Sequence, residues 1–500
     1  MYNIIIRVDA LLFCQNLKVV NRNDVTKNFI LAKMIYPSRK HAAKVFERLL
    51  KIDHKIRPVI YLESNRTCCR DDTDRELSFH QEANFMYLTG AKDLRGGSVV
   101  INLLPEFDHQ TEEKVKPENI FTTLFIPNLD PDEVMWCGLP PKPEDLLKLL
   151  PNLNEVKYQD QLSSHLNQLI KPHSILVLPN SKSDVKGFEL NPSANLLKAL
   201  HQSRTIKTEE EIQIMKLANQ ISSQAHETVM KSSSKEKFKS ETDAELIFVN
   251  ECKRLGSNHQ AYLPIFGHGI NAGTLHYVNN DEKISESFDG LLLMDAGCEM
   301  MGYASDITRT IPLSSNGKFN NQCKEIYEIV LEMQEKAIEI IAPGVDWNEI
   351  QILMHKIAAK GLLKLGILQN LTIDECYEGG HVIPFFPHGI GHFLGLDTHD
   401  VDGLPNGKST LNPAFKYLRL QRTLEVGNVV TVEPGIYFNK FLLEPFKESK
   451  FINHELLKKY MNVGGIRIED NVVVREKGCE NLTTAVKSVE DIERLCGGRS

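Results

Sequence analysis

Residues 381–403 read H-V-I-P-F-F-P-H-G-I-G-H-F-L-G-L-D-T-H-D-V-D-G and place His388, His392 and His399 within twelve positions. The glycines between these histidines argue against a regular helix and predict a backbone that turns sharply or passes close to another group. Imidazoles on such a glycine-rich, apolar segment suit metal binding or proton transfer. The alternative is three ordinary histidines with satisfied hydrogen bonds, so the rest of the chain has to decide.

Four carboxylates stand near the ends of apolar runs that predict strands. They are Asp295 in L-L-L-M-D-A-G, Asp306 in A-S-D-I-T-R-T-I, Glu433 in V-V-T-V-E-P-G-I-Y-F and Glu469 in G-G-I-R-I-E-D-N-V-V-V. A carboxylate in such a place has to be paired, hydrogen-bonded or bound to a metal. Each acid alone suits a salt bridge or a cap, but all four beside the histidine cluster indicate a metal site.

The local patterns bring these acids together. Asp295 and Asp306 flank C-E-M-M-G-Y, which predicts a hairpin that places them on facing strands. Arg467 and Glu469 are two positions apart and therefore share one face of a strand. A guanidinium beside a metal-ligating acid would offset its charge and hold its orientation.

The donor set indicates the metal and the chemistry. Four carboxylates with one imidazole exceed what a single zinc ion needs and fit two divalent ions that share carboxylates. Oxygen-rich donors without thiolates favour Mn²⁺, with Co²⁺ or Zn²⁺ as alternatives. We therefore expect two Mn²⁺ per subunit. Such a pair lowers the pKa of water and polarises a carbonyl, which is hydrolytic chemistry.

Composition limits the other functions. The 500 residues are 42% hydrophobic and 25% charged, which is ordinary for a globular protein with two or three domains. The net charge of -8 argues against nucleic acid as a partner. The sequence contains no run of 18 apolar residues, so no membrane span is expected. The ten cysteines are scattered, which favours reduced thiols and a cytoplasmic location.

We expect four segments along the chain. Residues 1–35 are basic and read as a flexible extension, with a mitochondrial presequence as the alternative. In residues 36–200, short apolar runs alternate with amphipathic segments, which predicts an α/β domain with a mixed sheet. Residues 201–488 form the second domain, and residues 489–500 are expected to be a C-terminal tail.

The second domain has an internal rhythm. One helix pair, 208–232 and 240–255, precedes four expected strands at 261–266, 274–278, 290–295 and 303–312. Another pair, 320–342 and 346–366, precedes the segments 381–403, 428–433 and 465–475. Two helix pairs followed by strands predict an α+β domain with pseudo-twofold symmetry.

Five motifs now stand in order along the second domain: M-D-A-G, S-D-I-T-R-T, H-G-I-G-H-F-L-G-L-D-T-H-D, V-E-P-G-I-Y and G-I-R-I-E-D. In these motifs the chain resembles the pita-bread-fold metallopeptidases, the creatinase/aminopeptidase-like group that includes methionine aminopeptidase, aminopeptidase P and prolidase. F-H-Q-E-A-N-F-M-Y-L-T-G (79–90) and W-C-G-L-P-P (136–141) are similar to the N-terminal domain shared by aminopeptidase P and prolidase. The resemblance implies a pita-bread catalytic domain behind an aminopeptidase P-type domain.

The resemblance implies five metal ligands: Asp295, Asp306, His392, Glu433 and Glu469. Asp306 and Glu469 would bridge the two ions, and Glu433 is the usual general base. His392 would be the one ligand among the three clustered histidines.

The resemblance also implies which residues face the substrate. His388 and His399 would stabilise the tetrahedral intermediate or move protons, and His276 in T-L-H-Y matches another active-site histidine. The expected catalytic residues are His276, His388, His399, Glu433 and Arg467, and the expected substrate-binding residues are Arg419, Tyr262 and Ile265.

Within the family, the insert 439–460 and H-F-L-G-L-D-T-H-D-V-D-G resemble the prolidase branch. Arg419 matches the arginine that holds the carboxylate of an Xaa-Pro dipeptide, which suits its fork of donors. The first expectation is therefore an Xaa-Pro dipeptidase in peptide catabolism and proline recycling. The alternative is an Xaa-Pro aminopeptidase that releases the residue before proline from longer peptides. A binding protein without catalysis is a third reading, which the intact ligand set opposes.

The expected partner is a small peptide with proline at its second position. Its Xaa-Pro bond lacks an N–H, so proteases that bind an N–H-bearing strand place it poorly. The chain departs from the family pattern at His268, where relatives carry a small residue, and at Ile270, where they often carry an acid. These changes bear on the substrate-binding wall. A homodimer is the default assembly of the family.

Overall fold

The computed structural model describes residues 35–54, 56–107, 114–169, 174–234, 237–405, 407 and 412–497. The chain divides into two compact units between Arg204 and Thr205. This division lies close to the boundary expected after residue 200, and the functional limits of the two domains stay a prediction. Apart from Ile35, the expected extension 1–35 lies outside the described residues. Among the described helices, none is long and apolar enough to cross a membrane.

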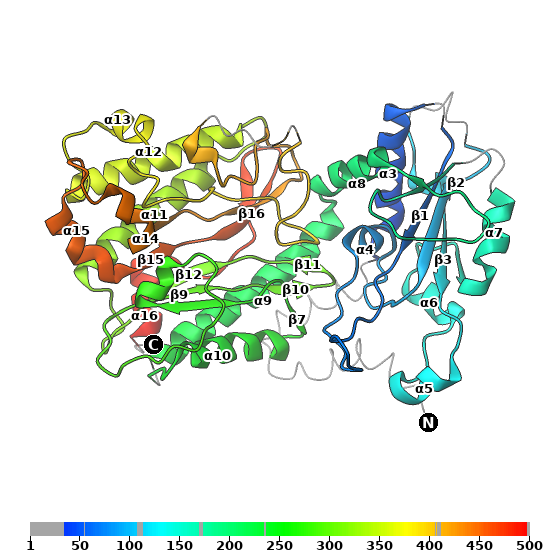
Figure 1. The fold of residues 1–500 in the computed structure, drawn as a ribbon, viewed down its shortest axis with the longest axis horizontal. Coiled ribbons are helices and arrows are strands. Elements are labelled where there is room, and N and C mark those ends of the chain that lie inside the picture. The colour runs from blue at the N-terminus through cyan, green and yellow to red at the C-terminus, as the bar shows by residue number, and fades with distance from the viewer. Residues whose placement is uncertain are drawn as a thin grey trace. The chain divides into compact units, whose positions relative to one another are not determined.

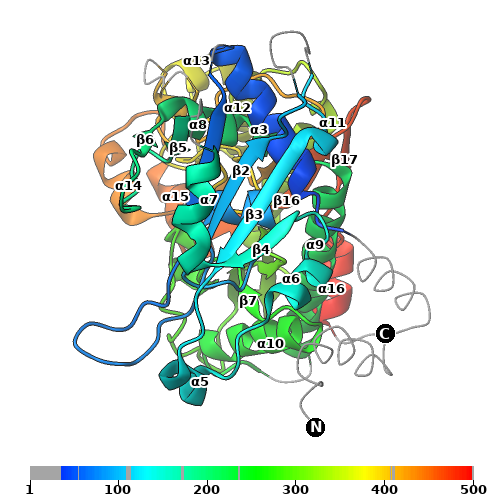
Figure 2. The same cartoon turned by 90° about the vertical axis from the view of Figure 1, so that its right-hand side faces the viewer.

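The first unit is built on a six-stranded mixed sheet with the order β4-β3-β2-β1-β5-β6. Its strands are β1 Pro58–Glu63, β2 Ser98–Leu103, β3 Ile120–Ile126, β4 Glu155–Tyr158, β5 Ser174–Val177 and β6 Asn191–Pro192. β2 pairs antiparallel with both β1 and β3, and the other pairs are parallel. Figure 2 faces this unit and shows β2, β3 and β4 side by side. The expected mixed sheet is confirmed.

The described helices of this unit are α3 Ser38–Ile52, α4 Ala83–Thr89, α5 Pro131–Cys137, α6 Pro143–Leu149, α7 Leu162–Leu169 and α8 Ala194–Thr205. Apart from α5, which has no buried residue, they contribute buried apolar side chains to this unit. The buried face of α3 includes Val45, Phe46 and Leu49, the 3.6-residue spacing that predicts an amphipathic helix. Leu166 of α7 packs in one cluster with Val59 of β1.

The first half of the second unit consists of a helix pair and two small sheets. α9 Glu209–Ser233 begins with a capping box between Thr208 and Glu211, and α10 Glu241–Arg254 follows it. The two sheets have the orders β12-β9-β8 and β11-β10-β7. Their strands are β7 His259–Gln260, β8 Ile265–His268, β9 Gly290–Asp295, β10 Cys298–Met300, β11 Tyr303–Ala304 and β12 Thr308–Leu313.

The second half repeats this arrangement. Its helices are α11 Asn321–Ile340, α12 Trp347–Leu365 and the short α13 Ile373–Glu378, α14 Lys440–Leu443 and α15 His454–Tyr460. The sheets β13-β16-β17 and β14-β15 comprise β13 Val429–Val432, β14 Gly435–Tyr437, β15 Gly465–Arg467, β16 Asp470–Val474 and β17 Cys479–Asn481. In Figure 1, β9, β12, β15 and β16 run between the helices α9 and α10 and the helices α11 and α12. One apolar core includes residues of both halves, such as Phe248 and Trp347.

Two predicted strands are interrupted, each at an expected metal ligand, and a third ends directly before one. The strand expected at 303–312 breaks at 305–307 around Asp306, and the one expected at 465–475 breaks at 468–469 around Glu469. Glu433 lies in the gap between β13 and β14. At these breaks the backbone leaves one strand pairing before the next begins, and the carboxylates of three segments meet there.

Two expectations about local structure are wrong. Residues 274–278 form no strand but follow a short 3-10 helix, η3 Gly269–Gly273. Residues 489–496 of the expected tail form the helix α16 Val489–Cys496, whose Ile492 is buried in the core of the second unit. The described part of that segment is therefore integral to the fold.

Candidate active site and metal centre

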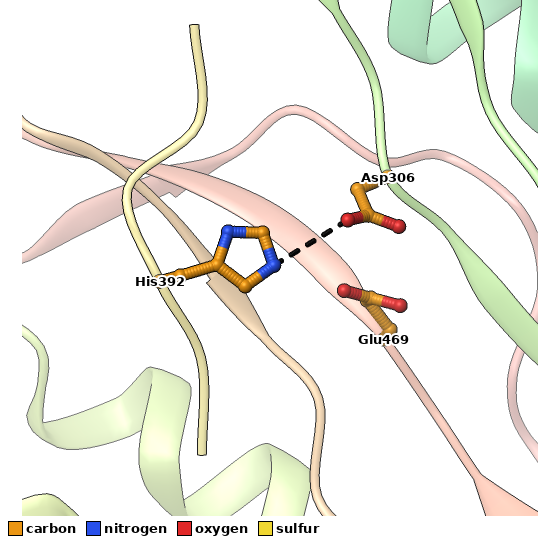
Figure 3. Close-up of side chains that lie close together, drawn as sticks. All are labelled: Asp306, His392 and Glu469. Atoms are coloured by element: carbon orange, nitrogen blue, oxygen red, sulfur yellow. Dashed lines mark ion pairs between the residues drawn. The ribbon is translucent and has the colours of Figure 1, made fainter. Parts of the chain in front are cut away.

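Asp306, His392 and Glu469 meet in the interior of the second unit. One donor atom from each side chain lies within 4.8 Å of those of the other two, and all three residues are buried. Figure 3 shows the imidazole of His392 pointing at the two carboxylates, which come from the first and second halves of the unit. The structure thus brings together three of the five expected ligands as a compact donor set.

Backbone and side-chain hydrogen bonds hold the two carboxylates of this set. The amide of Asp306 donates to Oδ1 of Asn471 over 2.9 Å. The amide of Glu469 donates to the carbonyl of Thr308 over 3.0 Å, and the Thr308 hydroxyl donates to Oε2 of Glu469 over 2.7 Å. Segments more than 150 residues apart are therefore joined next to the donor atoms.

The ring of His392 has a fixed orientation. Its Nδ1 lies 2.9 Å from the carbonyl oxygen of Phe393, which can only accept, so Nδ1 carries a proton. Its Nε2 is turned toward Oδ2 of Asp306 at 3.5 Å and Oε1 of Glu433 at 3.3 Å. Burial opposes protonation of the ring, but these two carboxylates raise the pKa of His392 overall, so a proton on Nε2 occupies the place that a cation would take between the three groups.

The glycine before His392 explains the unusual backbone of its segment. The amide of His392 donates to Oγ1 of Thr431, and the Thr431 amide donates to the carbonyl of His392. A Cβ on Gly391 would lie 2.1 Å from the Thr431 carbonyl oxygen. Only glycine lets this segment come so close to β13.

Asp295 and Glu433, the other expected ligands, border the same set. Asp295 ends β9 opposite Thr308, accepts from the Tyr262 hydroxyl at 2.6 Å and pairs with Nη2 of Arg467 at 2.5 Å. Glu433 is half-buried beside His392. Both carboxylates therefore lie where additional ligands would be needed, and their part in metal binding stays a prediction.

The carboxylates of the site repel one another, and the cationic side chains around them do not offset all of this negative charge. Burial, followed by repulsion from neighbouring carboxylates, raises the pKa of Glu433 to about 7 and also raises the pKa of Glu469 and Asp295. Burial opposes ionisation of Asp306, but its hydrogen bond to His392 lowers the pKa of Asp306 overall. A divalent cation would relieve this repulsion, so the residues present fit a metal.

A hydrogen-bonded chain links this centre to His388. Arg467, which pairs with Asp295, also donates from Nη1 to the Tyr437 hydroxyl over 2.9 Å. The same hydroxyl lies 2.8 Å from Nε2 of His388. Our reading of the sequence missed Tyr437, although it ends the V-E-P-G-I-Y motif. The available signal was its spacing, since Tyr437 lies opposite Gly465, two residues from Arg467, on paired strands.

The remaining expected catalytic groups line the open side of the site. Burial, followed by the charge of Arg467, lowers the pKa of His388 to about 3. His276, His399 and Arg419 are exposed. The His399 ring packs edge-on against His392 with centroids 4.5 Å apart. Desolvation and the charges of His392 and Arg419 lower the pKa of His399, so these groups are neighbours.

The expected substrate-binding residues differ in their surroundings. The Tyr262 hydroxyl is directed at Asp295. Ile265 is 4% exposed and packs in a cluster with Ala272 and Leu293 beneath the site. The substrate-binding roles of Tyr262 and Ile265 stay predictions, since Tyr262 already serves a carboxylate and Ile265 is covered.

The two departures from the family pattern have separate explanations. His268 binds Glu241, which accepts from the His268 amide at 2.9 Å and from its Nδ1 at 2.8 Å. Glu241 also accepts from Asn271 and from the Tyr277 hydroxyl, so one buried carboxylate organises the loop that we expected to be a strand. Ile270 is 68% exposed and contributes an apolar side chain to the surface.

Comparison with protein families identifies both parts of the chain. Residues 213–476 match the family model described as metallopeptidase family M24. Residues 39–178 match the model described as aminopeptidase P, N-terminal domain. The first match contains every expected metal ligand, and the second covers the mixed sheet of the first unit up to β5.

Individual proteins give the same result. "Probable Xaa-Pro aminopeptidase PEPP" of Paracoccidioides brasiliensis (strain Pb03) is 41% identical over 92% of this chain and 97% of its own length. The protein of the same name from Uncinocarpus reesii is 42% identical over 92% and 94%. The solved structure "aminopeptidase P from E. coli with the inhibitor Pro-Leu" has a TM-score of 0.72 at 26% identity and covers 93% of this chain and 99% of that one. Aminopeptidase PepP of Pseudomonas aeruginosa has a TM-score of 0.72 at 28% identity, with 92% and 98% covered. By its buried carboxylate and histidine centre and by these matches, the chain has the pita-bread fold and belongs to metallopeptidase family M24.

Proposed function

We propose that this metallopeptidase is an Xaa-Pro aminopeptidase, which releases the N-terminal residue from peptides that carry proline second. The observation that carries the proposal is the likeness to proteins named Xaa-Pro aminopeptidase over more than nine-tenths of both chains. The dipeptidase expected first from the sequence becomes the second candidate. The insert at 439–460, H-F-L-G-L-D-T-H-D-V-D-G and Arg419, on which that order rested, weigh less than this likeness.

We propose that Asp295, Asp306, His392, Glu433 and Glu469 hold two divalent ions and that manganese is the favoured metal. The donor set of carboxylates and one imidazole, without thiolates, supports this choice over a structural zinc site. When bound, such ions polarise a scissile carbonyl and lower the pKa of water. Zn²⁺ and Co²⁺ stay alternatives, since one solved aminopeptidase P structure is described as zinc-substituted.

The protein's own groups then have distinct tasks. Glu433 is the proposed general base, because its carboxylate lies beside His392 at the edge of the donor set. His388 is neutral at that pH and holds its Nδ1 proton against the carbonyl of Gly389. Its Nε2 accepts from Tyr437, so the ring is fixed. We assign His276 and His399 to the substrate because both are exposed beside this centre.

One specific feature favours the second candidate, an Xaa-Pro dipeptidase. Arg419 is exposed and close enough to His399 for its charge to lower the pKa of His399. In a dipeptide the terminal carboxylate follows the proline directly, so an arginine here would form a charge-assisted bond with it. In a longer peptide that carboxylate is farther away, and Arg419 would lack this partner.

Hydrolysis of Gly-Pro and of a longer X-Pro-Pro peptide, each with added Mn²⁺, tests the assignment. We expect cleavage of the longer peptide at the Xaa-Pro bond with a higher kcat/KM than for the dipeptide. Arg419→Met should then leave cleavage of the longer peptide unchanged within about twofold, since it removes only a carboxylate contact. Cleavage of Gly-Pro alone, with loss of that activity in Arg419→Met, would establish the dipeptidase instead.

Two further proposals concern the cellular location and the oligomeric state of the protein. We propose a cytoplasmic location and a homodimer. The nine cysteines that the structure describes are all free, which is compatible with a reducing compartment. Fractionation of cells and light scattering of the purified protein test these two points, and an organellar or monomeric protein would contradict them.

A further inference from the structure

His399 stands on a segment that is fastened on both sides. The hydroxyl of Thr398 donates to the carbonyl of Ala261 over 3.1 Å. The carboxylate of Asp400 accepts from Nζ of Lys207 over 2.8 Å. The exposed imidazole between these two contacts therefore depends on residues that do not themselves face the site.

The Lys207–Asp400 ion pair is fully buried. Each side chain is 1% exposed, in contrast to the exposed His399 next to it. The amide of Lys207 donates to the carbonyl of Gly427, which ties the start of the second unit to the loop before β13. The ammonium also lies 5.9 Å from the centre of the Phe393 ring. The pair is thus embedded between fixed backbone segments.

The backbone around the pair is shaped to admit it. A Cβ on Gly395 would lie 2.2 Å from Oδ2 of Asp400 and 3.0 Å from Cε of Lys207. The amide of Asp400 donates to the carbonyl of Phe393, and the amide of Ala304 donates to the carbonyl of Gly395. The glycine therefore gives the ion pair its space and places the turn beside the strand that leads to Asp306.

The residues after Asp400 place the segment of His399 next to the segment of Arg419. Asp402 adopts a φ of 62°, and its carboxylate accepts from Nη1 of Arg422 over 2.6 Å. The amide of Gln421 donates to the carbonyl of Gly403 over 2.9 Å. The segment that follows His399 thus runs alongside the segment that carries Arg419.

We propose that Lys207 and Asp400 are positioning residues, whose buried ion pair fixes the turn on which His399 meets the substrate. Stability alone explains the pair poorly. Removing two charges from water is costly, and apolar residues of similar size often serve a fold equally well or better. A directional charge pair, in contrast, fixes the position of the backbone to which it is attached. The proposal rests on the proposed function only in giving His399 the substrate as its partner.

The test is the paired replacement Lys207→Met with Asp400→Leu, which removes both charges of this ion pair together. We expect a folded protein with unchanged metal content, a kcat reduced by about tenfold or more and a KM changed by less than about threefold. In the His399→Ala background the same pair of substitutions should have no further effect on kcat. The matched control is Lys360→Met with Glu332→Gln, which removes a surface ion pair and should leave kcat unchanged.

A second measurement does not depend on activity. Amide hydrogen exchange across residues 394–403 should be faster in the Lys207→Met/Asp400→Leu protein than in the wild type and the control. Wild-type kcat in the paired variant, or an equal loss in the His399→Ala background, would overturn the proposal. If the wild type cleaves no Xaa-Pro peptide, the proposed function fails by itself. Amide hydrogen exchange then tests the positioning role by itself. Exchange across residues 394–403 that is unchanged in the Lys207→Met/Asp400→Leu protein would reject this role.

Discussion

The hydroxyl of Tyr437 donates a hydrogen bond to Nε2 of His388, with 2.8 Å between the two atoms. The direction follows from the other nitrogen of the ring. Because Nδ1–H donates a hydrogen bond to the carbonyl of Gly389, Nε2 has no proton and accepts from the hydroxyl. The same hydroxyl accepts from Arg467, which in turn pairs with Asp295. A predicted ligand, Asp295, and a predicted catalytic histidine, His388, are therefore connected through Arg467 and the uncharged hydroxyl of Tyr437.

Replacement of Tyr437 by phenylalanine removes only this hydroxyl. We expect kcat/KM to fall by about 10-fold to 100-fold with metal content retained, because outer partners that orient catalytic groups have effects of this size. Steady-state kinetics and metal analysis of the purified variant give both values. Tyr460→Phe is the control, since its hydroxyl binds Glu325 instead. Equal losses in the two variants would argue for a general packing effect.

Substitutions should distinguish the roles of the histidines in residues 381–403. His392→Ala removes the imidazole whose Nε2 faces Asp306 and Glu433, so bound metal should be lost together with activity. His388→Ala should slow turnover by about 100-fold with metal retained, because it removes a ring that Gly389 and Tyr437 hold in a fixed orientation beside the centre. Metal analysis after dialysis distinguishes them. Equal metal loss in both variants would show that this division of roles is wrong.

Removal of the two bridging candidates tests the metal centre directly. Asp306→Asn and Glu469→Gln keep the size of each side chain and lower its charge. Both variants should keep their circular dichroism and lose activity on the X-Pro-Pro peptide, because buried donors of one cluster are lost. Activity that survives either change would exclude a shared role for that carboxylate.

The metal-free protein should lose stability as the pH rises. The pKa of Glu433 is raised from 4.5 in the unfolded chain to about 7 in the metal-free fold, mainly by burial. The fold thus favours the protonated carboxyl, and this contribution is complete below pH 4.5 and lost as the pH passes 7. Because Glu433 titrates together with the neighbouring buried carboxylates, the decline belongs to this group of acids as a whole.

Urea unfolding at pH 5.5 and 7.5, with chelator and with Mn²⁺, measures this effect. Bound metal replaces the protons, so the decline should be present with chelator and absent with Mn²⁺. Glu433→Gln cannot titrate and should show a smaller decline in the metal-free state. Identical pH dependence with and without metal would contradict the assignment of Glu433 to the metal centre.

Arg309 should matter for stability more than any exposed arginine. It is fully buried, pairs with Asp470 at 2.7 Å and donates to the carbonyl of Glu469. Arg309→Met leaves the Asp470 carboxylate short of a partner, which costs about 3–5 kcal/mol for a buried pair. Arg254→Met breaks a pair that is half-exposed on its arginine side and should cost below about 1 kcal/mol. Thermal unfolding of the metal-loaded proteins compares the two.

Much of this site can be predicted because its residues lie in short, recognisable stretches of the sequence. Asp295 follows the apolar run 291–294, and the hairpin between it and Asp306, which was expected from C-E-M-M-G-Y, is formed by β10 and β11. The periodicity of α9 and of α11 predicted the helix pairs. Local pattern decides these features, so a single sequence is sufficient for them.

What could not be predicted depends on partners far away in the chain. Nothing local in residues 303–312 marks a break in the strand, and the break at Asp306 becomes visible only with Asn471 paired to its backbone. Residues 274–278 read as a strand because nothing local shows that Glu241 takes the donors of that loop. Lys207 and Asp400 are 193 positions apart, and each alone reads as an ordinary surface charge.

The hydrogen bond between Thr308 and Glu469 joins residues 161 positions apart, and the pair Asp295–Arg467 spans 172. Contacts of such separation form slowly, because the intervening chain has to be ordered before they stabilise anything. Neither half of the catalytic unit contains a complete donor set, since Asp306 comes from the first half and His392 and Glu469 from the second. A partly folded chain is therefore inactive, and peptide hydrolysis begins only when the most distant contacts of the domain are in place.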